Sequence, residues 1–171
     1  MVVWIIGLSG CGKTTLAKEV VRLARELRHP TVLLDGDKIR ELFQDDLDHS
    51  LEGRKGNADR ICRLSRFLEQ QGINVVCAIL SLFPESRNWC RENLINYYEV
   101  FIDTPIDELI QRDSKGLYRQ FNEGKIQNVA GLDLEFTRPE TPDLLIKNDS
   151  TLDDFLLNAS LIFQQLNNEV K

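Results

Sequence analysis

Residues 7–14 read Gly-Leu-Ser-Gly-Cys-Gly-Lys-Thr and match the phosphate-binding loop pattern G-x-x-x-x-G-K-[ST] at every fixed position. Residues 2–6, before the loop, are apolar and mostly β-branched, which predicts a buried strand. From Thr14 onward the apolar residues have the spacing of a helix. A strand, a glycine loop and a helix in this order surround a phosphate with backbone amides and the positive end of the helix dipole. The stretch therefore predicts a nucleoside triphosphate site on an α/β fold.

Two side chains of the loop predict how the triphosphate is held. Lys13 stands where a lysine ammonium reaches the β- and γ-phosphates, and Thr14 where a hydroxyl binds Mg²⁺. The alternative is a glycine turn that matches by chance, and the flanking strand and helix argue against it. The open question is the fate of the γ-phosphate.

Composition excludes several classes of function. The 171 residues carry a net charge of −6, which argues against a general nucleic-acid binder. No apolar run approaches the ~20 residues that cross a bilayer, and the apolar N-terminus lacks the basic residues of a signal peptide. The four cysteines lack C-x-x-C spacing, which disfavours a disulfide framework or a zinc site. Cys11, within the glycine loop, is either a reactive thiol or a small residue that fills a small slot. We expect a cytoplasmic enzyme with no nucleic-acid or membrane partner.

Four further apolar runs predict strands at residues 31–35, 73–80, 99–103 and 143–147, with helical patterns between them. Nearly continuous apolar strands are typical of a parallel sheet covered on both faces. We therefore predict a single domain, residues 1–171, with the P-loop NTPase three-layer α/β sandwich and a five-stranded parallel sheet. Ligands should gather at the carboxyl ends of its strands. The polar segment at about 112–142 is predicted to be a lid over this edge.

The ends of the predicted strands carry polar side chains suited to phosphoryl transfer. Asp35 and Asp37 follow the second strand, where one carboxylate can approach Mg²⁺ or accept a hydroxyl proton. The alternative is a plain Asp-Gly turn. Arg40 and Arg54 belong to a cation-rich segment after Asp37, which is either a site for a second anionic substrate or a solvated helix face.

Seven motifs in order along the chain resemble those of adenylylsulfate (APS) kinases, across nearly the full length. The matching stretches are Gly7–Thr15, Leu34-Asp35-Gly36-Asp37-x-x-Arg40, Arg54-x-x-Asn57, Leu80-Ser81, Phe101-Ile102-Asp103-Thr104-Pro105, Arg112-Asp113-x-Lys115-Gly116-Leu117-Tyr118 and Asn128-x-x-Gly131-x-Asp133. That family uses ATP and Mg²⁺ to phosphorylate the ribose 3′-hydroxyl of adenylyl sulfate, and its members are usually dimers. The resemblance implies the same ATP-dependent transfer to a nucleotide here, in a homodimer.

The resemblance also implies a role for each matching position. ATP binding is implied for Gly7, Leu8, Ser9, Gly10, Cys11, Gly12, Lys13, Thr14, Thr15 and Arg112, and Mg²⁺ binding for Thr14 and Asp35, directly or through water. Acceptor binding is implied for Asp37, Arg40, His49, Arg54, Asn57, Leu80, Lys115 and Val129. Catalysis is implied for Asp35, Lys13 and Ser81. Family descriptions label the matching serine a phosphoserine intermediate, although direct in-line transfer requires positioning and charge stabilisation rather than a covalent serine.

The base-recognition part of the acceptor site departs from the family pattern. Family members hold the adenine between two phenylalanines, and this chain has His49 and Val129 at those positions. Stacking on an aromatic side chain is worth ~1–3 kcal/mol for each base, so adenine affinity should fall. Either His49 and its neighbours hold adenine in another way, or the acceptor differs, as in relatives from capsule-modification gene clusters that phosphorylate cytidine diphosphoramidate.

Two other functions fit the phosphate loop less well. A GTP-driven switch should carry the guanine-reading run N-K-x-D, and the nearest string, Lys147-Asn148-Asp149, has another order. A kinase for an unrelated sugar acid or nucleoside would not need the arginines that follow Asp37.

Overall fold

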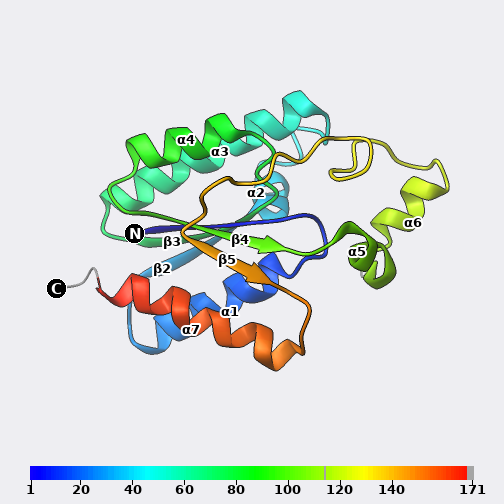
Figure 1. Ribbon diagram of the computed structural model, residues 1–171. Coiled ribbons are helices and arrows are strands. Elements are labelled where there is room, and N and C mark those ends of the chain that lie inside the picture. The colour runs from blue at the N-terminus through cyan, green and yellow to red at the C-terminus, as the bar shows by residue number, and fades with distance from the viewer. Residues whose placement is uncertain (114, 169–171) are drawn as a thin grey trace.

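The computed structural model describes residues 1–113 and 115–168 (Figure 1). The elements follow one another as β1 (Val2–Ile6), α1 (Lys13–Glu26), β2 (Thr31–Asp35), α2 (Gly36–Leu42), α3 (Leu51–Gln70), β3 (Asn74–Ile79), α4 (Pro84–Asn93), β4 (Tyr97–Asp103), α5 (Ile106–Arg112), α6 (Leu117–Asn122), β5 (Leu144–Lys147) and α7 (Leu152–Asn168). Each predicted strand is present, with its ends displaced by no more than two residues. Among the described residues, no helix is both long enough and apolar enough to cross a membrane.

The five strands form one parallel sheet in the order β2-β3-β1-β4-β5, as predicted. The central strand β1 is fully buried, and its last residue, Ile6, pairs with Ile79 of β3 and Phe101 of β4. This register brings the carboxyl ends of all three strands to one edge. The loops that follow them, including the phosphate loop, therefore share that edge.

Helices cover both faces of the sheet, which confirms the predicted three-layer P-loop NTPase sandwich. Helices α3 and α4 lie on one face, and α1 and α7 lie on the other (Figure 1). Alternate residues of β1 serve the two cores, because successive strand side chains point to opposite faces. Val3 and Ile5 pack on the α1 and α7 side, and Trp4 packs on the α3 and α4 side.

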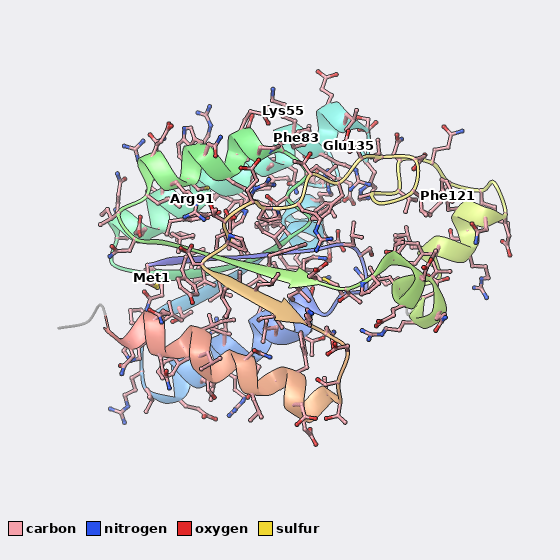
Figure 2. The ribbon with its side chains drawn as sticks, in the orientation of Figure 1. Met1, Lys55, Phe83, Arg91, Phe121 and Glu135 are labelled. Atoms are coloured by element: carbon pink, nitrogen blue, oxygen red, sulfur yellow. The ribbon has the colours of Figure 1, made fainter. Side chains whose placement is uncertain are left out.

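The segment predicted to be a lid lies beyond the carboxyl ends of the strands. It contains helix α6 and an isolated bridge between Ala130 and Leu134. Figure 2 shows Phe121 of α6 at the opposite end of the molecule from Met1, where the first strand begins. The polar segment therefore lies next to the edge where the sequence predicts ligands.

Candidate active site

A cleft of about 710 Å³ opens at the carboxyl edge of the sheet. A smaller recess of about 70 Å³ adjoins it, and the two share walls that include Asp37, His49, Arg54 and Leu80. The cleft is bounded by the phosphate loop, the ends of β2 and β3, and residues of the 112–142 segment. The predicted position of the ligand site, at this edge of the sheet, thus coincides with a cleft large enough for a nucleotide.

Six of the ten residues predicted to bind ATP line the cleft, namely Ser9, Gly10, Gly12, Lys13, Thr14 and Thr15. Gly12 has a φ of 101°, and a β-carbon there would lie 2.9 Å from the Phe155 ring, so this position requires glycine. The Lys13 ammonium donates to the Leu8 carbonyl at 2.7 Å, within the loop. The side chain of Lys13, the first residue of α1, therefore folds back onto the backbone of the phosphate loop.

The other four predicted ATP ligands do not line the cleft. Cys11 is fully buried beneath the loop, which agrees with a small residue filling a small slot. The Arg112 side chain donates to the Asn148 carbonyl at 2.6 Å and to Glu108 at 3.0 Å. Gly7 and Leu8 belong to the loop but do not line the cleft, and Leu8 lines a separate pocket at the end of β4.

Thr14 and Asp35 meet beside the phosphate loop. The Thr14 hydroxyl donates to Asp35 Oδ2 at 2.6 Å, and Asp35 Oδ1 accepts the Asp37 amide at 3.0 Å as the N-cap of α2. Asp35 is 9 % exposed and borders the cleft. Mg²⁺ in kinase sites takes one or two protein oxygens together with substrate phosphates and water. The hydroxyl and carboxylate oxygens of this pair fit such an ion.

Two arginines and a histidine, Arg40, Arg54 and His49, lie where the cleft meets the recess. Arg54 donates through Nε to the His49 carbonyl at 2.8 Å and through a terminal nitrogen to the Asn128 carbonyl at 2.7 Å. Arg40 is buried and donates to the Leu47 and Asp48 carbonyls. Burial lowers the pKa of Arg40, His49 and Arg54, and the positive charge of Arg40 lowers the pKa of His49 and Arg54 further. An anion bound here would offset that positive charge.

Asn57 contributes an unpaired polar atom to the recess wall. Its side-chain nitrogen donates to the Gly36 carbonyl at 3.2 Å, which fixes the orientation of the amide. Its Oδ1 is buried and has no hydrogen-bond partner among the described residues, and the whole residue is only 4 % exposed. A buried acceptor without a donor costs about 1–3 kcal/mol, so a ligand that donates to it would gain binding energy.

Residues of the 112–142 segment approach the cleft from the opposite side. Lys115 donates to Asp37 Oδ2 at 3.0 Å. Burial would raise the pKa of Asp37, but the hydrogen bond and charge of Lys115, helped by His49 and Lys13, lower it. The Asp37 side chain is 68 % exposed, so the pair adds little to stability. Val129 lines the cleft but is 3 % exposed, because it also packs in the core.

Ser81 has a structural environment rather than an open position on the cleft. Its hydroxyl accepts from the Trp4 indole at 3.3 Å, and its carbonyl accepts from Arg87 at 2.9 Å. The residue is buried, has a φ of 53° and lines only the recess. Leu80, in contrast, lines both the cleft and the recess.

Some residues of the cavity walls carry no signal in the sequence. Gln120, Ile126 and Gln127 line the cleft, and Phe83, labelled in Figure 2 next to the start of α4, lines the recess. Gln120, Ile126 and Gln127 belong to a polar segment without periodicity, so the sequence does not show which of its side chains point into the cleft. Phe83 lies in the run Ser81-Leu82-Phe83-Pro84, and nothing in that run shows which way its ring points.

Comparisons with known proteins identify the family of this chain. A sequence model of the family described as adenylylsulphate kinase matches residues 1–147. The chain is 38% identical over 150 residues to the cytidine diphosphoramidate kinase of Campylobacter jejuni, covering 86% of this chain and 85% of that protein. It is 36% identical over 168 residues to the adenylyl-sulfate kinase of Pseudomonas aeruginosa, covering 97% and 86%.

Solved structures lead to the same group. The structure of the Mycobacterium tuberculosis APS kinase CysC in complex with AMPPNP and APS matches with a TM-score of 0.88 at 32% identity, covering 97% of this chain and 96% of that one. The resemblance expected from the motifs is thereby confirmed. The chain belongs to the adenylylsulphate kinase family of phosphate-loop kinases.

Proposed function

We propose that this protein transfers the γ-phosphate of ATP to the ribose 3′-hydroxyl of a nucleotide whose 5′-phosphate is modified. One observation carries the proposal: the phosphate loop and the Thr14–Asp35 pair line the same cleft as Arg54, and Arg40 lines the recess that adjoins this cleft. A triphosphate suits the phosphate loop and an anionic acceptor suits the two arginines.

The transfer forms a bond between the acceptor 3′-oxygen and the γ-phosphorus and breaks the bond between the γ-phosphorus and the β–γ bridging oxygen, releasing ADP. Lys13 stabilises charge on the phosphates, and Asp35 accepts or orients the hydroxyl proton. Mg²⁺, held by Thr14 and Asp35, would neutralise charge on the phosphate oxygens. Lys115 would bring a further positive charge and help to exclude water as the 112–142 segment closes.

The acceptor that the family name implies is adenylyl sulfate. A second candidate, cytidine diphosphoramidate, is favoured by His49 and Val129, because together they replace the two phenyl rings that hold adenine in the family with a smaller imidazole and an aliphatic side chain. A pyrimidine is smaller and depends less on two stacking surfaces. The chain is 38% identical to a cytidine diphosphoramidate kinase and 36% identical to an adenylyl-sulfate kinase, so overall identity is compatible with either acceptor.

A coupled ADP-release assay tests the reaction and the acceptor together. Adenylyl sulfate, cytidine diphosphoramidate and the unmodified nucleoside diphosphates would each be offered with ATP and Mg²⁺, and with GTP as donor control. We expect acceptor-dependent ADP from one of the two modified nucleotides, with the phosphate placed on the 3′-oxygen by ³¹P NMR. Absence of acceptor-dependent turnover with every compound would reject the kinase proposed here.

We also propose that the protein works as a homodimer, as the resemblance to the family implies, and that it is cytoplasmic, as expected from its composition. Light scattering at micromolar concentration should give twice the chain mass of 19.7 kDa. A single-chain mass under assay conditions would reject the dimer.

A further inference from the structure

Two side chains outside the phosphate loop bind its backbone carbonyls. The Tyr118 hydroxyl, from helix α6, donates to the Ser9 carbonyl at 2.8 Å. The Asn148 side-chain nitrogen, just after β5, donates to the Cys11 carbonyl at 3.0 Å. The donors lie 109 and 137 residues along the chain from their acceptors, so only the folded protein brings them to the loop.

Each of these hydrogen bonds fixes the direction of the next amide. In a planar trans peptide the carbonyl of one residue and the N–H of the following residue point in opposite directions. Holding the Ser9 and Cys11 carbonyls outward therefore turns the Gly10 and Gly12 amides the other way. Both glycines line the cleft, and in residues 1–113 and 115–168 no hydrogen bond occupies either amide.

We propose that Tyr118 and Asn148 are positioning residues that preset the Gly10 and Gly12 amides for the phosphates of the donor nucleotide. The inference rests on the proposed ATP donor. Glycine has the widest conformational freedom of all residues, so a loop with three glycines would otherwise sample many peptide orientations. Fixing two of its peptides before binding lowers the entropy cost of binding.

Tyr118 is itself held firmly enough for this task. Its ring is 2 % exposed, and its amide donates to Asp113 Oδ1 at 3.0 Å, while Asp113 Oδ2 accepts the Arg119 amide. Burial, together with the nearby Cys11 and Asp113, raises the pKa of the Tyr118 hydroxyl to about 12. The hydroxyl therefore remains protonated, and remains a donor, throughout the physiological range.

A contact with Arg112 holds the backbone of Asn148. The Asn148 carbonyl accepts from Arg112 at 2.6 Å, and the Asn148 side-chain nitrogen is close enough to Gly12 that a β-carbon there would lie 3.1 Å from it. Arg112 and Tyr118 stand at either end of a short stretch that also contains Lys115, the partner of Asp37. The same stretch thus contacts the donor loop and the acceptor side of the cleft.

The test uses the whole protein with ADP and Mg²⁺ as the probe, so no acceptor is needed. Tyr118→Phe removes one hydroxyl and keeps the buried ring, and Asn148→Ala removes the donor amide. Calorimetry should show ADP affinity reduced about fivefold or more in each variant, the equivalent of about 1 kcal/mol for one hydrogen bond. Tyr98→Phe on β4 and Asn93→Ala on α4, which alter the same residue types away from the loop, should bind ADP like the unsubstituted chain.

A spectroscopic readout separates positioning from general loosening. The chain has 10 glycines, so a spectrum with ¹⁵N-glycine labels resolves the loop amides. ADP should move the Gly10 and Gly12 amide protons downfield, with the Gly10 shift reduced in Tyr118→Phe and the Gly12 shift reduced in Asn148→Ala. ADP affinity within twofold of the unsubstituted chain, or weaker affinity with both glycine shifts intact, would overturn the inference. Absence of ADP binding to the unsubstituted chain would reject the proposed donor and this inference with it.

Discussion

Asp35 joins two parts of the cleft through its two carboxylate oxygens. One accepts the Thr14 hydroxyl from the start of α1, and the other accepts the Asp37 amide at the start of α2. The Asp-Gly sequence at residues 35–36 could equally belong to an ordinary turn. Its position at the end of β2 places the carboxylate beside the phosphate loop and on the cleft wall, which supports the role proposed for it.

We expect Asp35→Asn to lower kcat about 100-fold or more while ADP still binds, because a lost general base or metal organiser affects the chemical step. Asparagine is as good an N-cap as aspartate, so α2 should remain folded. Steady-state kinetics and ADP calorimetry provide the check. A kcat within tenfold of the unsubstituted enzyme would remove Asp35 from the chemistry.

We expect Arg54→Ala to raise the acceptor KM by about 10- to 100-fold, because a charge-assisted contact to an anion is worth about 1.5–3 kcal/mol. The variant also loses the hydrogen bonds to the His49 and Asn128 carbonyls, which join the two sides of the cleft. Arg66→Ala, an exposed arginine on the same helix, is the matched control and should leave the acceptor KM unchanged. Equal KM values for the two variants would favour the unrelated small-acceptor kinase.

We expect acceptor affinity to rise as the pH falls from 7 to below 6. Burial and the nearby arginines lower the pKa of His49 beneath its ordinary value of about 6.5, so the imidazole is neutral at pH 7. A bound anion favours the protonated ring, so binding takes up a proton and acid strengthens it. Calorimetry across this range measures the effect, and His49→Gln should abolish it. The same pH slope in His49→Gln would assign the proton to another group.

The loop of residues 128–134 shows how one short element shapes the cleft. Asp133 accepts the Asn128 amide at 2.7 Å and the Val129 amide at 2.5 Å, and the Gly131 amide donates to the Leu134 carbonyl at 2.8 Å. These bonds account physically for the spacing of the Asn128-x-x-Gly131-x-Asp133 motif. They also hold Val129 at the cleft, where the chain departs from the family pattern.

We expect Gly131→Ala to destabilise the protein by about 1 kcal/mol more than Gly124→Ala. Both glycines have positive φ, at 87° and 69°, so both variants carry the cost of a left-handed residue. A β-carbon at Gly131 would also lie 3.1 Å from Leu8 and 3.2 Å from Ile106, whereas nothing lies within 4 Å at Gly124. Urea unfolding measures the free energy of unfolding of each variant, and the difference between the two variants gives the cost of crowding at residue 131. Equal losses would show that only the backbone conformation matters.

The cleft as a whole is built from parts of the chain that are distant in sequence. Its walls combine the phosphate loop, the residues after β2 and β3, the start of α3 and the 112–142 segment. Two polar contacts, Lys115 with Asp37 and Tyr118 with Ser9, join that segment to opposite sides of the cleft. Ligands on both sides should therefore affect the segment together.

We expect AMPPNP and the acceptor, added together with Mg²⁺, to slow amide hydrogen exchange in residues 117–131 more than either ligand alone. Closure over both substrates would suppress local opening of this segment. The amides of β1 are the internal control, because the strand is already fully buried. Unchanged exchange in residues 117–131 would reject the lid.

The phosphate-loop side of the cleft could be predicted from local sequence because β1, the loop and α1 are consecutive in the chain. Residues 2–26 contain strand, loop and helix in one stretch, so periodicity and glycine spacing predict the element and its chemistry together. The five strands were equally predictable, since buried parallel strands form continuous apolar runs. The location of Asp35 and Asp37 at the edge of the sheet followed from the predicted end of the second strand.

The side of the cleft proposed to bind the acceptor depends on contacts between distant residues, which no local pattern encodes. The sequence could not show that Ser81 bonds to Trp4, that Arg112 turns toward Asn148, or that Arg54 bridges the loops at His49 and Asn128. Residues 112–142 lack periodicity. The sequence therefore could not show that Gln127 lines the cleft or that Tyr118 donates a hydrogen bond to the phosphate loop. Local spacing specifies which elements form, whereas packing between them decides which side chains meet a ligand.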